Sequence, residues 1–375
     1  MVDAGRQVVC TGSVVEPDEL IALGVYDPDD EHAGLRLELL HYVLALGATE
    51  EELVTFKDTL PALAGVLAVR DGPALTLEEA AERSGMTSED MRQLARAAGI
   101  PDPEPEVPVF TEGFVTFAAG MSAVSAVFGE DARTQLVRVL GSAMSRVADA
   151  VVSSFLVNVL PAAVREDPAG LGVARANVET AALLPVVAPG LDALLRQHLL
   201  IARRLSAPDA DLVGFETRQL VVGFVDLVGS TELGEQLTIG DLSVTLADFE
   251  HIASDTIAEG GGRVVKLIGD EIMYTAPDEF SAASIALDLA DAFDDHPVVP
   301  QARAGLAVGE VLLRDGDVFG PVVNLASRAV KVAQPGEVVT TAKVAVGAGL
   351  PSVPLGPHQL SGIPGQVELH RLIRN

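Results

Sequence analysis

The run from Val264 to Tyr274, VVKLIGDEIMY, constrains this chain most, because it places Lys266 and Asp270 around a glycine turn between two strand-like segments. A glycine–aspartate turn of this kind favours a β-hairpin. A second carboxylate, Asp226, follows another apolar run and opens a loop of small residues. Singly, each aspartate is more typical of a plain turn. Together, at the ends of two strands, they predict a nucleotide-and-metal site suited to Mg²⁺ or Mn²⁺.

The composition limits the classes of protein to which the chain can belong. Its 375 residues are enough for two or three domains, and 49% of them are hydrophobic, which suffices to fill the cores. A net charge of -29 disfavours binding to nucleic acid or to anionic membrane surfaces. The single cysteine, Cys10, can form no internal disulfide, and the N-terminus lacks the apolar core of a signal peptide. We therefore expect a cytoplasmic protein.

Two apolar segments in the first half resemble membrane spans only superficially. Ala150 to Val164 has 15 residues, including a proline, whereas a bilayer requires about 20. We interpret it as a buried helix. Ala181 to Leu195 is interrupted by two prolines. No membrane span is expected.

The residue pattern changes near the middle of the sequence, from helical spacing to short β-rich runs. The first half has apolar residues at helical spacing and two capping boxes, Thr49 to Glu52 and Thr76 to Glu79. After about Leu212, short β-rich runs alternate with helical stretches. We expect an all-α domain over residues 1–205 and a second domain over residues 212–375.

The second half predicts an ordered series of elements. They are a strand (Leu220–Val225), a helix (Asp241–Glu259), two strands (Arg263–Ile268 and Glu271–Thr275), a helix (Phe280–Phe293) and a strand (Ala302–Val308). This βαββαβ order favours an α+β fold of the ferredoxin-like type, with helices on one face of a largely antiparallel sheet.

A family resemblance begins at about Thr217. The run from Asp317 to Arg328, DVFGPVVNLASR, keeps the spacing of the motif Asp-x-x-Gly-x-x-Val-Asn-x-Ala-Ser-Arg, and Lys266 to Asp270 matches Lys-x-x-Gly-Asp. Over roughly 160 residues the chain resembles the catalytic domain of class III nucleotide cyclases. The resemblance implies a role for each matched residue: metal binding by Asp226 and Asp270, adenine recognition by Lys266 and Asp317, ribose binding by Asn324, stabilisation of charge on the α-phosphate by Arg328, and phosphate contact by Arg303.

ATP is the expected substrate. Adenine offers a donor at N6 and an acceptor at N1, which a carboxylate and an ammonium complement, whereas guanine presents the reverse pattern. The resemblance implies conversion of ATP to 3′,5′-cyclic AMP and pyrophosphate. It also implies a homodimer in which the metal aspartates of one chain face the other binding residues of its partner.

The loop from Leu227 to Thr231 is a candidate phosphate cradle. Backbone amides around Gly229, Ser230 and Thr231 suit the β- and γ-phosphates, although a plain strand-to-helix connection fits the sequence equally well.

One position departs from the family pattern. Ser361 stands where many members have the lysine of a Leu-Lys-Gly sequence, so a phosphate-contacting lysine is missing. Lys331 or Arg314 is the alternative cation, and the sequence does not choose between them.

The first half resembles the regulatory half of autoinhibited mycobacterial adenylate cyclases, which implies control of catalysis. The linker helix over residues 191–205 is the expected relay, and protonation of His198 or His41 could bias it. The apolar helices from Phe114 to Val164 could instead take a lipid or another apolar ligand. Residues 75–94 have the form of a DNA-binding helix-turn-helix, but acidic residues open the second helix and favour a packing unit.

Two other functions compete with ATP cyclisation. A catalytically weak nucleotide-sensing module is favoured if Ser361 is disabling. A guanylate cyclase is a further alternative, and a diguanylate cyclase is suggested because Ile268 to Ile272, IGDEI, echoes the Gly-Gly-Asp-Glu-Phe signature of that family. Lys266 and the run from Asp317 to Arg328 argue against it.

Overall fold

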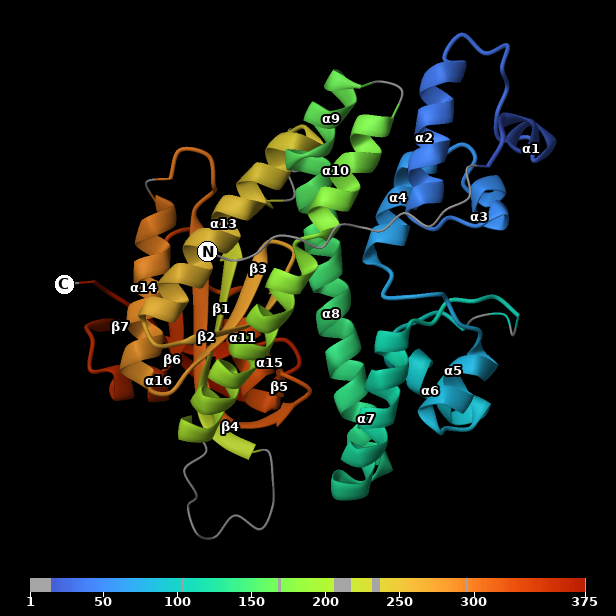
Figure 1. Cartoon of the computed structure of the whole chain (residues 1–375). Helices are drawn as coiled ribbons and strands as arrows, with labels where there is room; N and C mark the ends of the chain where they lie inside the picture. The colour runs from blue at the N-terminus through green and yellow to red at the C-terminus, as the bar shows by residue number, and fades with distance from the viewer. Residues whose placement is uncertain are drawn as a thin grey trace, which may run out of the picture. The chain divides into compact units, whose positions relative to one another are not determined.

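The computed structural model describes residues 15–102, 104, 106–167, 170–205, 217–230, 237–294 and 296–374. The chain divides into two compact units, Met1–Ala207 and Pro208–Asn375 (Figure 1). The predicted boundary between the two domains, residues 206–211, lies outside the described residues.

The described part of the first unit is helical. Its helices are α1 (Pro17–Ala22), α2 (Ala33–Ala45), α3 (Glu50–Thr55), α4 (Leu60–Val69), α5 (Leu77–Ser84), α6 (Ser88–Ala97), α7 (Glu112–Phe128), α8 (Glu130–Asn158), α9 (Leu160–Glu166), α10 (Leu171–Ala181) and α11 (Leu184–Leu205). Both predicted capping boxes are confirmed. Thr49 caps α3 and Thr76 caps α5, each in reciprocal hydrogen bonds with the glutamate three residues later.

Two separate cores hold this unit together. Leu39, Leu40 and Leu63 belong to a core formed by α1 to α4 and α10. Met91 and Leu94 belong to a second core, formed by α5 to α8. Both cores consist of buried apolar side chains, which stabilise the unit through the apolar area that they remove from water.

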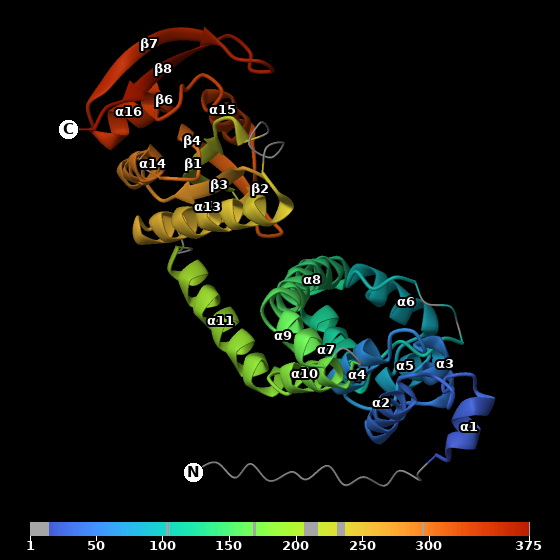
Figure 2. The ribbon, with the colours of Figure 1, turned by 90° about the horizontal axis from the view of Figure 1, so that it is seen from above.

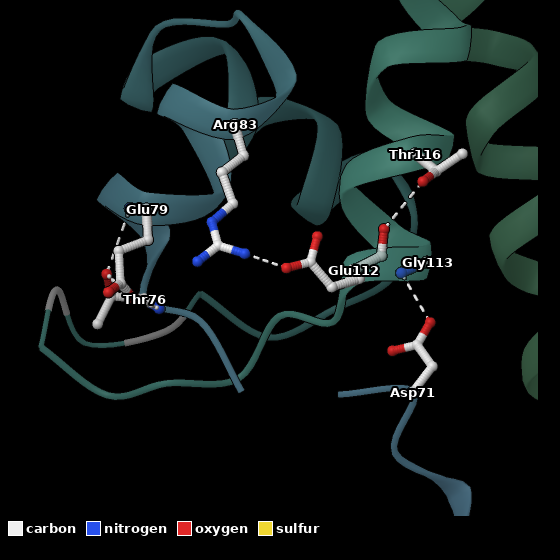
Figure 3. A network of polar contacts seen from close by, with 7 residues as sticks. All are labelled: Asp71, Thr76, Glu79, Arg83, Glu112, Gly113 and Thr116. Atoms are coloured by element: carbon white, nitrogen blue, oxygen red, sulfur yellow. Dashed lines mark hydrogen bonds and ion pairs between the residues drawn. The ribbon is translucent and has the colours of Figure 1, made fainter. Parts of the chain in front are cut away.

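The helix-turn-helix-like segment is part of the second core. Gly85, in the left-handed conformation, ends α5, and α6 begins three residues after it, at Ser88. Figure 3 shows polar contacts that link this segment and the preceding loop to α7. Arg83 of α5 pairs with Glu112 of α7, and the Gly113 amide of α7 donates to the Asp71 carboxylate at 2.7 Å. The burial of its apolar face supports the interpretation as a packing unit.

The prediction that Ala150 to Val164 forms a buried helix is wrong. The segment runs through the end of α8 into α9, and most of its side chains are exposed, including Val152 at 55% and Val157 at 72%. Its apolar residues lie around the whole helix, so no single stripe is available to bury against the unit. The expected interruption of residues 181–195 is correct near Pro185, which lies in the first turn of α11 after a break that follows Ala181, and wrong at Pro189, through which α11 continues.

Two stretches, Glu130–Arg165 and Leu171–Ile201, are long and apolar enough to cross a membrane, and the most apolar window of each is unburied. Core helices of soluble proteins can meet the same length and composition criteria. The absence of a membrane span therefore stays a prediction.

The second unit combines one sheet with helices. Its described elements are β1 (Thr217–Leu227), α13 (Ile239–Glu259), β2 (Arg263–Ile268), β3 (Glu271–Ala276), α14 (Glu279–Asp294), β4 (Ala302–Arg314), β5 (Asp317–Phe319), α15 (Pro321–Ala329), β6 (Val338–Thr341), α16 (Ala342–Ala348), β7 (Ser352–Gln359) and β8 (Gln366–Leu372). The strands lie in the order β2-β3-β1-β4-β6-β8-β7, with β5 beside β4. Among these described strands only β4 and β6 pair in parallel. The predicted βαββαβ series is present from β1 to β4.

Both faces of the sheet are covered. Helices α13, α14 and α16 pack on one face, around residues such as Phe249 and Leu289. Helix α15 packs on the other face, through Val322 and Ala326 (Figure 2). The expectation that helices lie on one face is therefore incomplete. Helix α15 has an apolar stripe of its own, and that stripe is buried against the second face of the sheet.

Candidate functional site

Asp226 lies near the end of β1, between two strands that bring charged residues to the same level of the sheet. In the antiparallel register it is opposite Glu271 of β3 and Arg303 of β4. Cross-strand neighbours point to the same face, so the three side chains meet. The Arg303 Nε and Nη2 both donate to Asp226 Oδ2, at 2.9 and 2.6 Å. This ion pair is half-buried, with 28% of the arginine and 19% of the aspartate side chain exposed.

Asp270 is brought to the same place by the β2–β3 hairpin. Gly269, with a φ of 65°, forms the turn in a conformation that suits glycine. The Asp270 carbonyl accepts a hydrogen bond from the Leu227 amide at 3.2 Å, and the Ser230 hydroxyl donates to the Asp270 carboxylate. These bonds fix the hairpin tip beside the end of β1, so the two predicted metal ligands lie together.

The residues around these carboxylates line a cavity of about 350 Å³, which we call the carboxylate pocket. Its lining consists of Asp226, Leu227, Gly229, Ser230, Ile268, Asp270, Glu271, Arg303 and Lys331. The pocket thus holds three carboxylates and two cations.

Two members of the pocket, Glu271 and Lys331, were not predicted as members of the metal site. Burial, and then the Asp226 carboxylate, raise the pKa of Glu271 above its ordinary value, while Lys331 counteracts this shift. The strand alternation of β3 could have revealed Glu271, because it begins the strand opposite Asp226. No local signal marks Lys331, which reaches the pocket through tertiary packing.

The donor chemistry of the pocket fits a hard divalent cation. Asp226, Asp270 and the Ser230 hydroxyl provide oxygen atoms, and Mg²⁺ in nucleotide sites commonly takes one or two carboxylates and fills its other positions with water and phosphate. Among the residues that the structure describes, no group of three or more His, Cys, Asp or Glu side chains is arranged to hold a metal by itself.

The predicted base-recognition residues form a second polar cluster. Lys266 Nζ lies 2.6 Å from Asp317 Oδ2, which joins β2 to β5. The other oxygen of Asp317 accepts a hydrogen bond from the Val318 amide at 2.7 Å, which fixes the carboxylate. Neither member of this Lys266–Asp317 pair is among the residues that line the carboxylate pocket.

Helix α15 carries the remaining predicted binding residues. Asn324 is exposed, and no hydrogen bond of its side chain is found among the described residues. Arg328 Nε donates to the Ser361 carbonyl at 3.1 Å, so the loop with the missing lysine supports the arginine expected to bind phosphate.

The structure describes part of the loop predicted to bind phosphate. Gly229 and Ser230 line the carboxylate pocket, and Thr231 lies outside the described residues. Two backbone amides of the loop are already engaged: Leu227 donates to the Asp270 carbonyl, and Val228 donates to the Gln301 carbonyl at 2.9 Å. The amides of Leu227 and Val228 are therefore occupied within the protein, and phosphate binding by the amides of Gly229, Ser230 and Thr231 stays a prediction.

The two histidines considered as regulators lie in the helical unit. His198 is exposed on α11. His41 lies in α2, and its Nε2 atom is buried without a hydrogen-bond partner among the described residues. A buried ring nitrogen without a hydrogen-bond partner costs free energy.

Comparison with known proteins assigns the chain to a family. No protein-family model matches the chain. Over 315 residues the chain is 32% identical to an adenylate cyclase of Streptomyces coelicolor, across 82% of this chain and 73% of that protein. A pH-sensitive adenylate cyclase of Mycobacterium tuberculosis is 29% identical over 357 residues, across 90% of this chain and 88% of its own.

Among solved structures, the adenylyl cyclase CyaB from P. aeruginosa superposes with a TM-score of 0.40 at 21% identity, over 43% of this chain and 97% of its own. The extent and identity of the match to the Streptomyces coelicolor enzyme decide the relationship. This chain belongs to the class III adenylate cyclase family.

Proposed function

We infer that the chain is an adenylate cyclase that converts ATP to 3′,5′-cyclic AMP and pyrophosphate. The observation that carries this inference is the meeting of Asp226 and Asp270 in the carboxylate pocket, together with a separate Lys266–Asp317 pair. Relatives named adenylate cyclase support the same reaction. In this proposal β1 to β4 with α13 and α14 form a ferredoxin-like catalytic core, and the enzyme is cytoplasmic.

Recognition of ATP is assigned to the Lys266–Asp317 pair. The Asp317 carboxylate accepts from the adenine N6 amino group, and the Lys266 ammonium donates to N1. The two side chains neutralise each other at 2.6 Å in the free protein, so they are positioned before the base arrives. Guanine presents the opposite donor and acceptor, which makes GTP the poorer substrate.

In this proposal the residues of the chain position the nucleotide and stabilise the charge that develops during the reaction. Asp226 and Asp270 are the residues that would hold two Mg²⁺ or Mn²⁺ ions, which when bound supply Lewis acidity to the ribose 3′-hydroxyl and neutralise the triphosphate. Asn324 orients the ribose, Arg303 binds phosphate oxygens, and Arg328 stabilises charge on the α-phosphate. The 3′-oxygen then bonds to the α-phosphorus, its proton passes to water, and the bond to pyrophosphate breaks.

Each active site is proposed to need two chains. The described structure separates the carboxylate pocket from the Lys266–Asp317 pair within one chain, which supports a homodimer with two equivalent sites. One chain supplies the metal-binding acids, and its partner supplies the base pair, Asn324 and Arg328.

Incubation of the purified protein with ATP and Mn²⁺ tests the activity. The expected product is cyclic AMP, formed in equal amount with pyrophosphate. If only binding is seen, the chain is a nucleotide-sensing module. Parallel assays with GTP distinguish a guanylate cyclase, which releases cyclic GMP, from a diguanylate cyclase, which joins two nucleotides.

Residues 1–205 are proposed to regulate this activity through α11, with His198 or His41 as pH-responsive groups or an apolar ligand as effector. The exposed apolar side chains of α8 and α11 support the second possibility. Comparison of the full-length protein with a fragment starting at Pro208 tests the role, since the second unit has its own core. Equal specific activity and an equal pH profile would exclude regulation by the first unit, and a response to added fatty acid in the full-length protein alone would favour an apolar effector.

A further inference from the structure

The two cations of the carboxylate pocket differ in how they are engaged. Arg303 is held by Asp226 through two hydrogen bonds. For the Lys331 ammonium, by contrast, no ion pair or hydrogen bond is found within the part of the chain that the structure describes. Lys331 nevertheless faces the pocket closely enough to affect the pKa of Glu271. It is therefore a cation available to a ligand without the loss of an existing ion pair.

Close packing between α15 and the sheet fixes the position of Lys331. A Cβ atom at Gly305 of β4 would lie 2.2 Å from the Val330 amide nitrogen and 2.6 Å from the Ala326 carbonyl oxygen. Glycine at this position lets the end of α15 approach the strand directly. Val330 is fully buried there, and Lys331 follows it and lines the carboxylate pocket together with Arg303 of β4.

The alternative cation, Arg314, lies elsewhere. It occupies the opposite end of β4 from Arg303, where it is paired in register with Asp317. Its Nε lies 3.5 Å from the Asp315 carboxylate, and 60% of its side chain is exposed. Arg314 is not among the residues that line the pocket. Of the two cations that the sequence left open, only Lys331 is placed beside the carboxylates.

We propose that Lys331 binds the triphosphate of the nucleotide whose metal ions are held by the same chain. An ammonium is a compact point charge that binds phosphate well. Once divalent ions neutralise the carboxylates, Lys331 and Arg303 make the pocket attractive to a polyanion. Lys331 thereby takes the phosphate-binding role of the lysine that Ser361 replaces. This inference rests on the proposed function.

Binding of inorganic triphosphate to the full-length protein tests the role without relying on turnover. We would titrate Mn²⁺ with inorganic triphosphate into wild type, Lys331→Met, Lys331→Arg and Arg314→Met, and follow the heat of binding. Lys331→Met should weaken triphosphate binding about tenfold, as expected for loss of one charge-assisted hydrogen bond. Lys331→Arg should recover most of the affinity, and Arg314→Met should behave as wild type.

Steady-state kinetics separate this role from a structural one. Lys331→Met should raise KM for ATP about tenfold with a smaller change in kcat, and adenosine should inhibit both proteins equally. If Lys331→Met binds triphosphate as tightly as wild type, or if Arg314→Met is equally impaired, the proposal is wrong. If wild type makes no cyclic AMP but still loses triphosphate binding on this substitution, the cyclase assignment fails while the role of Lys331 stands. If wild type binds no triphosphate in the presence of Mn²⁺, both fail.

Discussion

The carboxylate pocket and the Lys266–Asp317 pair differ in how their charges are balanced. In the pocket, three carboxylates face two cations, so negative charge is in excess and a further cation is favoured. The Lys266–Asp317 pair balances one charge against one, at 2.6 Å, and leaves no net charge. The first arrangement suits metal and polyphosphate, and the second suits a neutral base with a matching donor and acceptor. One domain therefore separates the attraction of charged ligands, at the carboxylate pocket, from recognition by hydrogen bonds, at the Lys266–Asp317 pair.

The largest effect is expected from Asp270→Ala, which removes one carboxylate from the pocket and leaves the Lys266–Asp317 pair intact. Loss of metal-assisted stabilisation is worth several kcal/mol, so cyclic AMP formation should fall at least about a hundredfold. Adenosine binding, measured by calorimetry, should stay near the wild-type value. Equal losses of metal and adenosine binding would mean that the two clusters do not act separately.

The next largest effect concerns the packing that carries Lys331 to the pocket. In Gly305→Ala the added methyl group meets the backbone of Val330, which cannot move away as a flexible side chain could. We expect destabilisation of about 1–3 kcal/mol in denaturant unfolding. Gly240→Ala is the matched control, because Gly240 lies in the first turn of α13 with no atom closer than 3.8 Å to the new methyl group. An equal loss of stability in both variants would rule out close packing at Gly305 as the cause.

A change of opposite sign is expected for metal binding in Arg303→Met. A divalent ion at Asp226 competes with the two hydrogen bonds from Arg303, so removal of the guanidinium should tighten Mn²⁺ binding about tenfold while weakening ATP binding. Lys331→Met removes a cation from the same pocket without freeing Asp226. It should therefore tighten Mn²⁺ binding less. Mn²⁺ titration followed by electron paramagnetic resonance gives the comparison, and equal effects would indicate a general response to charge.

The smallest effect is expected from a polar pair outside both clusters. Arg371 Nη1 lies 2.7 Å from Glu337 Oε1. Burial acts to raise the pKa of Glu337, but hydrogen bonds from Arg371 and from the Gln334 amide outweigh it and leave the pKa below its ordinary value. Such a half-exposed pair contributes roughly 0–1 kcal/mol.

The pH dependence of that contribution has a definite sign. A lowered carboxylate pKa stabilises the fold above the ordinary glutamate pKa of about 4.3, and the contribution disappears as pH falls through the lowered value. Arg371→Met should therefore lower Tm slightly at pH 7, and the difference from wild type should shrink toward pH 3, with cyclic AMP formation unchanged. A Tm difference that widens in acid would contradict this assignment.

Much of the second unit could be predicted from its sequence because the informative features are local. Strand alternation and the Gly269-Asp270 turn give the β2–β3 hairpin, and the run after β1 gives the position of Asp226. The bonds between Asp226 and Arg303 depend on the β1–β4 register, which joins residues that are 77 positions apart. Lys331 depends on the approach of α15 to Gly305, which no local pattern encodes.

The first unit was predicted less well for a different reason. High apolar content in α8 suggested burial, but burial requires a partner surface as well as a sequence, and the described part of the unit provides none for side chains such as Val157. Capping boxes were predicted correctly because they involve residues only three positions apart.

Complementation between two inactive variants tests most directly whether the pocket of one chain works with the base-binding cluster of another. Asp270→Ala lacks a metal ligand, and Arg328→Ala lacks the arginine assigned to the α-phosphate. In a mixed dimer, one site combines both defects and the other has neither. Shared sites predict that mixing the two variants, after dissociation and reassociation, restores a substantial fraction of wild-type cyclic AMP formation. A mixture that forms mixed dimers yet stays as inactive as its components would contradict the two-chain site.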